Sequence, residues 1–264
     1  MSTAAKYWRF LLAQWQVNLS SAMAYRTSFL TQALFMMLND VFLLFFWWVL
    51  LQIVPNIGGA DMSQIWLMYG LSAGGYGLLT VFCGNTFHLA RLISEGQLDY
   101  YLALPKSTLL HVLVSQTDFA GIGDLIFGLI VGAMGCRAND SSYLLFLFFL
   151  LTSAAILGAF VVMVQSLSFF IGRSEAASQQ ISQSIMSLAM YPGGIYRGAS
   201  RFLITFIIPA GLMVHMPVEA LLSFRMSTVV LVALAAIIFW GLAIAVFQAG
   251  LHRYESGNQM QLRG

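Results

Sequence analysis

Long, almost uncharged apolar stretches, separated by short polar links, constrain this chain more than any other feature. A membrane-spanning helix needs about 20 predominantly apolar residues, whereas a membrane barrel would show short segments of alternating hydrophobicity. Charged residues make up only 8% of the chain, against roughly 25% in soluble domains. Because backbone polar groups in lipid must be satisfied within their own segment, the sequence predicts an all-α polytopic membrane protein.

The apolar stretches predict a transmembrane domain over 29–251. The region 192–225 interrupts it, because Pro192 and Pro209 break helices and the apolar piece 202–214 is too short to cross comfortably. We interpret 192–225 as re-entrant half-helices in the outer leaflet, although one more full span would also fit. Six transmembrane helices are expected at about 29–54, 64–89, 109–135, 143–171, 176–191 and 227–250. In the second of these, Gly70 and Gly74 form a pair that lets helices approach closely.

Residues 1–28 precede the first span and show a helical apolar stripe that includes Trp8 and Trp15. Lys6 and Arg9 fall away from that stripe. This pattern predicts an amphipathic interfacial helix on the cytoplasmic surface, with its tryptophans at headgroup depth. An ordinary soluble amphipathic helix is the alternative.

The twelve Lys and Arg residues indicate the orientation. With the N-terminus inside, eight fall on the inner face and four on the outer face, which agrees with the positive-inside rule. Both termini, the 91–106 loop and a tail at 252–264 are then cytoplasmic. The inner residues are Lys6, Arg9, Arg26, Arg91, Lys106, Arg173, Arg253 and Arg263, and the outer ones are Arg137, Arg197, Arg201 and Arg225.

No catalytic motif is present in the sequence. A GxxxxGK[ST] phosphate loop, HExxH, CxxC and GxSxG are all absent, so we expect neither a catalytic residue nor a bound cofactor. The four histidines are scattered, and Cys83 and Cys136 form no ligand pattern, so no metal site is expected. The net charge of +2 is too small to indicate a nucleic-acid partner.

Three acidic residues, Asp40, Asp118 and Asp124, fall within predicted spans, where charge is costly and often functional. One hypothesis is a proton relay, in which a secondary transporter is driven through Asp118 and Asp124. His111 lies seven residues before Asp118 and would share its helix face. The alternative, which we favour, is that each carboxyl group pairs across the bundle or faces a polar cavity.

The 91–106 loop is the longest polar interruption between two long apolar runs. Gly96 would allow a sharp exit from the second span, Asp99 could cap a short helix at its N-terminus, and Pro105 would end that helix. Leu98, Leu102 and Leu104 would offer an apolar surface to a partner. Any cytoplasmic loop needs charges, a glycine and a proline, so these residues alone leave the role of the loop open. Its other charged residues are Arg91, Glu95 and Lys106.

Several short motifs follow one another along the chain in a fixed order. The most specific is I-x-x-G-x-L-D-x-x-L-x-x-P, which runs from Ile93 to Pro105. The order and spacing of these motifs resemble those in the ABC-2 type permeases, specifically the bacterial branch of small six-span permeases that pair with a separate ATPase. The other motifs are Tyr25-Arg26, Phe46-Trp47, Tyr191-Pro192, Ile195-Tyr196, Phe206 to Ala210, and Arg253 to Asn258.

This resemblance implies a permease in a bacterial inner membrane, most often an exporter. It implies a dimer of two copies or of two related permeases, each meeting an ABC ATPase subunit that binds ATP and Mg²⁺. The 91–106 loop would be the coupling helix on which that ATPase pushes, and the N-terminal helix would also rest on the ATPase. The sequence departs from the family pattern in one respect, because no basic residue stands just before Pro105, and Lys106 follows it instead.

Overall fold

A computed structural model describes residues 3–54, 56–105, 107–172 and 174–254. Within these ranges the chain is helical, with a single isolated bridge between Ile57 and Ala60 in place of any strand. The predicted all-α polytopic fold is confirmed. Five helices are long and apolar enough to cross a membrane, namely Arg26–Ile53, Met62–Ser94, Gly121–Ala138, Tyr143–Ile171 and Met226–Leu251.

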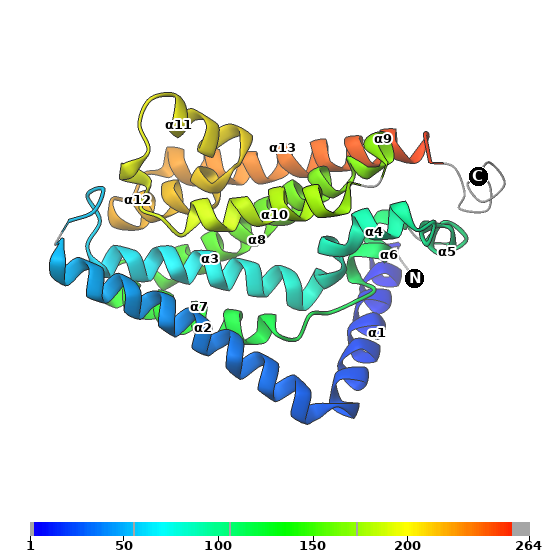
Figure 1. Ribbon diagram of the computed structural model, residues 1–264, viewed down its shortest axis with the longest axis horizontal. Coiled ribbons are helices and arrows are strands. Elements are labelled where there is room, and N and C mark those ends of the chain that lie inside the picture. The colour runs from blue at the N-terminus through cyan, green and yellow to red at the C-terminus, as the bar shows by residue number, and fades with distance from the viewer. Residues whose placement is uncertain (1–2, 55, 106, 173, 255–264) are drawn as a thin grey trace.

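The helices follow one another in a simple up-and-down order with short elements at the turns (Figure 1). The elements are α1 (Thr3–Ala24), α2 (Arg26–Ile53), α3 (Met62–Cys83), η1 (Gly84–His88), α4 (Leu89–Ser94), α5 (Leu98–Leu102), α6 (Thr108–Val114), α7 (Gly121–Ala138), α8 (Tyr143–Gln165), α9 (Ser168–Ile171), α10 (Glu175–Ala189), η2 (Gly193–Ile195), α11 (Ala199–Phe202), η3 (Leu203–Ile207), η4 (Gly211–His215), α12 (Met216–Leu222) and α13 (Met226–Leu251).

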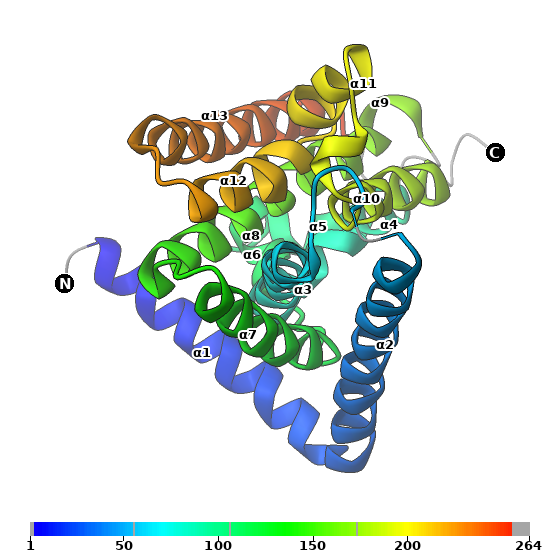
Figure 2. The same ribbon diagram turned by 90° about the vertical axis from the view of Figure 1, so that its left-hand side faces the viewer.

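Helix α3 forms the centre of the bundle, with α7 and α8 beside it (Figure 2). Its side chains are largely buried, and Ile65, Leu67 and Leu71 have no exposed surface. Helices α2 and α13 lie on the outside and expose large apolar side chains such as Phe42 and Ile237. In a membrane such apolar surface is the surface that faces lipid or another membrane protein.

Helices α3 and α7 approach each other through glycines on both sides. A Cβ atom added to Gly70 would lie 2.6 Å from the Cα of Gly132, and one added to Gly128 would overlap the backbone of Gly74. Small residues are the usual means of close packing between membrane helices. The close approach expected at Gly70 and Gly74 is therefore confirmed, with α7 as the neighbouring helix.

The third predicted span is wrong as one continuous helix over 109–135. Helix α6 ends at Val114, residues 115–120 are not helical, and α7 begins at Gly121. Polar side chains in 115–118 compete for backbone hydrogen bonds and disfavour a helix. Neighbouring elements satisfy the freed backbone, since the Asp118 amide donates to Thr80 O at 3.0 Å and the Asn85 amide donates to Gln116 O at 3.2 Å. His111 and Asp118 therefore do not share a helix face.

The fifth predicted span, 176–191, corresponds to α10, which has 15 residues. At 1.5 Å per residue this helix is about 22 Å long, shorter than the roughly 30 Å hydrocarbon layer. It packs against α8 through polar contacts. Ser178 donates a hydrogen bond to Val164 O at 3.3 Å, and Gln165 donates to Ser182 at 3.4 Å. These buried contacts account for Ser178 and Ser182 in a helix of the bundle.

The region 192–225 contains a sharply bent pair of helical segments. Ala199–Ile207 and Gly211–Leu222 meet at 81°, on either side of the Pro209 break. Both segments lie at the end of the bundle that is opposite to α5 (Figure 1). A bent pair that stays at one end has the shape expected of re-entrant half-helices.

The start of α1, the short helices α4 to α6 and the end of α13 lie together at the other end of the bundle (Figure 1). Helix α1 runs across the direction of the long helices and joins α2 at an elbow beside Tyr25. It exposes Trp8 and Leu19, at 58% and 50%. This placement suits a helix lying in the membrane surface.

Candidate coupling site

The turn at Gly96 is the sharpest feature of the 91–106 loop. Gly96 has φ of 73°, a left-handed conformation that glycine adopts without steric cost. The Gln97 amide donates to Leu92 O at 3.0 Å and the Gly96 amide donates to Ile93 O at 3.3 Å. These two bonds form a Schellman motif. They end α4 and turn the chain into α5.

Helix α5 presents a different apolar surface from the one expected. Leu98 is completely buried, so it cannot contact a partner. Tyr100 and Leu102 are 69% and 42% exposed, and Leu104 is half-buried. A five-residue helix has one inward face, and Leu98 occupies it. The outward apolar pair is therefore Tyr100 and Leu102, and Tyr100 was not among the residues expected.

Asp99 does not cap α5, contrary to the sequence-based expectation. The helix begins at Leu98, its N-cap is Gln97, and no side chain caps it. Asp99 instead lies in the first turn, where a negative charge suits the helix dipole, and it faces Tyr254 beyond the end of α13. Burial, and secondarily the charge of Asp99, raise the pKa of Tyr254 to about 12, so this hydroxyl stays neutral at physiological pH.

The remaining loop residues are spread over its surface. Arg91 is half-buried in α4, and Glu95 is exposed and accepts a hydrogen bond from the Gln97 side chain at 2.7 Å. Helix α5 ends at Leu102, so Pro105 does not itself terminate it. Lys106 lies outside the described residues.

A buried apolar cluster joins the loop to the long helices. Leu98 inserts from α5 between residues of α4 and α6, and the same cluster continues into α8 and α13. The loop is therefore packed as part of the bundle. The cluster consists of Leu89, Leu92, Ile93, Leu98, Leu109, Val112, Leu113, Ala159, Val162, Ala243 and Phe247.

Gly96→Ala is expected to destabilise the turn by about 1 kcal/mol, because a Cβ atom is unfavourable in the left-handed region. Hydrogen exchange of the amides in 91–105 should then quicken in the purified protein. Gly96→Asn is the matched control, since asparagine tolerates this conformation, and it should exchange close to the wild-type rate. Equal exchange in Gly96→Ala and wild type would contradict the argument.

The non-helical segment 115–120 meets the loop and two other elements at Ser115. The Ser115 hydroxyl accepts hydrogen bonds from Asn85 of η1 at 2.7 Å and from Tyr101 of α5 at 3.1 Å. It also donates to Val112 O at 2.7 Å. The end of α3, the loop and the end of α6 are therefore joined by one side chain.

Helix α1 docks on this segment through polar side chains. Asn18 is 9% exposed and donates to Val114 O at 3.1 Å and to the Thr117 hydroxyl at 3.0 Å, while Gln14 reaches Ser115 O at 3.4 Å. Trp15 donates to Phe82 O at 3.2 Å. Arg9 is exposed. The sequence signal for this contact was two amides, Gln14 and Asn18, four residues apart on one helix face.

Asn18→Ala should weaken the docking of α1 by about 2 kcal/mol, because Val114 O and Thr117 lose a buried partner. Limited proteolysis within α1 in membranes would report the release. Gln16→Ala on the exposed side of the same helix should leave the cleavage rate unchanged. If both variants are cleaved as slowly as wild type, Asn18 does not hold the helix.

The three acidic residues predicted inside spans separate into a pair and a single residue. Asp40 of α2 and Asp124 of α7 are 4% and 2% exposed and lie beside each other where these two helices pack together. Asp118 is exposed in the non-helical segment. Asp40 and Asp124 thus lie together inside the bundle, whereas Asp118 lies between α6 and α7, where its amide donates to Thr80 O of α3.

The described residues hold no cluster of three or more metal-ligating side chains. The fold is thus that of a multi-pass helical membrane protein with a packed polar loop at one end. A family model described as ABC-2 family transporter protein matches residues 18–258, and the chain belongs to this family. No curated protein and no solved structure matches it. Members of the family are membrane components of ABC transporters, and membership implies an ABC ATPase as partner.

Proposed function

We propose that this chain is the permease subunit of an ABC-2 type exporter in a bacterial plasma membrane. It would move a hydrophobic or amphipathic substrate with ATP and Mg²⁺ bound by a separate ATPase subunit. The apolar bundle with few charged residues supports such a substrate. A second permease, identical or related, would complete the pathway, and the lipid-exposed faces of α2 and α13 offer surfaces for it.

The observation that supports the coupling role is the way in which α5 packs. It exposes Tyr100 and Leu102 while Leu98 anchors it in the cluster shared with α8 and α13. A push on the exposed side of α5 would therefore move the ends of long helices. The start of α1 and the end of α13 lie at this end of the bundle, and the excess of Lys and Arg supports a cytoplasmic location for it.

Affinity purification of the tagged chain from its native membranes tests the proposal. A soluble ATPase with a phosphate-binding loop should co-purify in stoichiometric amount, and the chain alone should hydrolyse no ATP. Changing Glu95, Asp99 and Leu102 together should uncouple ATP turnover from substrate. Intact coupling in that variant would show that the loop is not the contact.

A further inference from the structure

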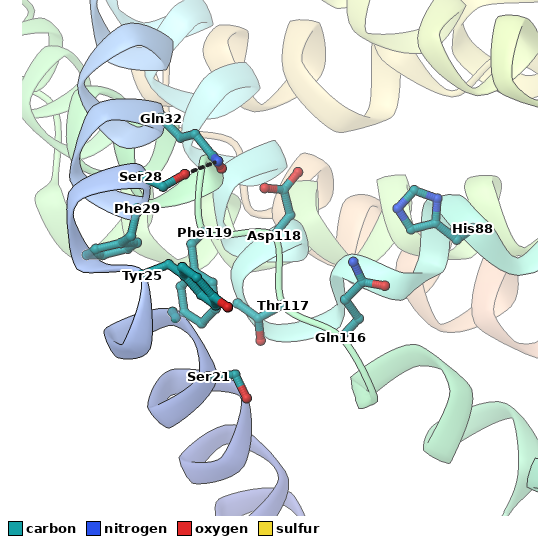
Figure 3. A pocket seen from close by; sticks show the side chains of 11 residues that line it. Ser21, Tyr25, Ser28, Phe29, Gln32, His88, Gln116, Thr117, Asp118 and Phe119 are labelled. Carbon is teal, nitrogen blue, oxygen red and sulfur yellow. Dashed lines mark hydrogen bonds between the residues drawn. The ribbon is translucent and has the colours of Figure 1, made fainter.

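A polar cavity of about 370 Å³ opens beside the elbow between α1 and α2 (Figure 3). Its opposite wall is the non-helical segment that precedes α7. This segment ends where α7, one of the helices long enough to cross a membrane, begins, so we place the cavity near the membrane boundary on that side. Six residues matter for its chemistry: Tyr25, Phe29, Gln32, Thr117, Asp118 and Phe119.

Asp118 makes the cavity electronegative. One carboxylate oxygen accepts a hydrogen bond from the Ala120 amide at 3.0 Å. Figure 3 shows the carboxylate pointing to the side of the cavity where Gln32 lies. No lysine or arginine is among the described residues that line the cavity, and no ion pair is found for Asp118 in the described part of the chain. Among the described residues that line the cavity, the carboxylate thus has no lysine or arginine partner, and His88 is the one histidine beside it.

Three aromatic side chains line the same cavity as this carboxylate. Phe29 and Phe119 meet edge to face with their centroids 5.5 Å apart, and Tyr25 lies on the same side of the cavity (Figure 3). Aromatic faces attract cations, and they attract them more strongly when the cation is partly desolvated. A carboxylate and aromatic rings that line one cavity are the groups that recognise an ammonium group.

An apolar groove continues from the cavity along α2. It shares Ser28 and Gln32 with the cavity, and its further wall includes Phe35, Met36 and Ala120. Gln32 and Ser28 are held together by a hydrogen bond of 3.0 Å. A ligand that filled both spaces would need a polar head at Asp118 and an apolar chain along α2.

We propose that this cavity and groove bind an amphiphile through its ammonium group. The ammonium group pairs with Asp118 among the aromatic rings, and the apolar chain lies against α2. Two sources share this chemistry, namely an aminophospholipid of the surrounding membrane and a cationic amphiphilic cargo. Binding of a membrane lipid does not depend on the proposed function, whereas binding of a cargo rests on it.

The lipid arm uses the full chain in nanodiscs containing equal amounts of phosphatidylethanolamine and phosphatidylglycerol, followed by native mass spectrometry of retained lipid. Wild type should retain the ethanolamine lipid preferentially, and Asp118→Asn should lower that preference by about tenfold, which corresponds to one charge-assisted contact of ~1.4 kcal/mol. Asp140→Asn is the matched control. Asp140 is exposed at the opposite end with φ of 50°, which asparagine tolerates.

The cargo arm measures binding of dodecylamine to the same three proteins, with dodecyl sulfate as a probe of opposite charge. A tenfold loss of dodecylamine affinity in Asp118→Asn, with lipid retention unchanged, assigns the site to cargo. A loss in the lipid arm assigns it to the membrane lipid. If Asp118→Asn matches wild type in both arms, the proposal is overturned. Neither arm needs ATP, so its failure is distinct from failure of ATP-driven export.

Discussion

Replacing Tyr100 and Leu102 by alanine together is expected to weaken binding of the ATPase partner about a hundredfold. Buried aromatic anchors dominate most protein interfaces, and two lost anchors of about 1.4 kcal/mol each give this factor. Tyr100 and Leu102 are 69% and 42% exposed in the single chain and neither belongs to the buried cluster, so the permease itself should fold normally. Affinity can be measured between the purified permease in nanodiscs and its ATPase.

The matched control is Phe224→Ala. Phe224 is 67% exposed in the link between α12 and α13, at the opposite end of the bundle. It should leave the affinity unchanged. Wild-type affinity in the Tyr100 and Leu102 double variant would place the ATPase contact elsewhere. Loss of affinity in the Phe224 variant would show that the assay responds to any exposed aromatic residue.

Gly128→Ala is expected to destabilise the protein by about 3 kcal/mol, the upper end of the cost of overpacking. The added methyl group would overlap the backbone of Gly74, and neither backbone can rotate away. Helices α3 and α7 would have to separate along their length. The thermal unfolding midpoint in detergent should fall accordingly.

Gly241→Ala provides the comparison for this change. Gly241 lies in α13, and a Cβ atom there would meet no atom within 4 Å. Alanine has the higher helix propensity, so the unfolding midpoint should stay the same or rise. An equal effect of the two substitutions would mean that glycine content, and not the contact between α3 and α7, controls stability.

The fold class could be predicted from the sequence, because backbone hydrogen bonds in lipid can be satisfied only within helices or closed barrels. The glycine contact at Gly70 and Gly74 was also readable, since only small residues permit it. The break between α6 and α7 could not be predicted, because a stretch such as 115–118 can remain helical when no hydrogen-bond partner is near. The side chains of Asn18 and Asn85, which are distant in the sequence, donate hydrogen bonds to Thr117 and Ser115 in this stretch.

The sequence predicted those features of the candidate site that depend only on neighbouring residues in the chain. Gly96 was expected to turn the chain, and its positive φ requires only the residues beside it. The inward position of Leu98 and the outward position of Tyr100 depend on α4, α6 and α13. A five-residue helix has too short a periodic pattern to reveal its buried side. The role of Asp99 was misjudged for the same reason, since the start of α5 is set by the turn before it.

The gap between α6 and α7 has a mechanical consequence. A force applied to α5 passes into α6, but six non-helical residues prevent it from continuing along the axis of α7 as through a stiff rod. The displacement must instead pass sideways, through Ser115 and Asn85 to the end of α3 and through Asn18 to α1. The central helix α3 and the surface helix α1 would then tilt together.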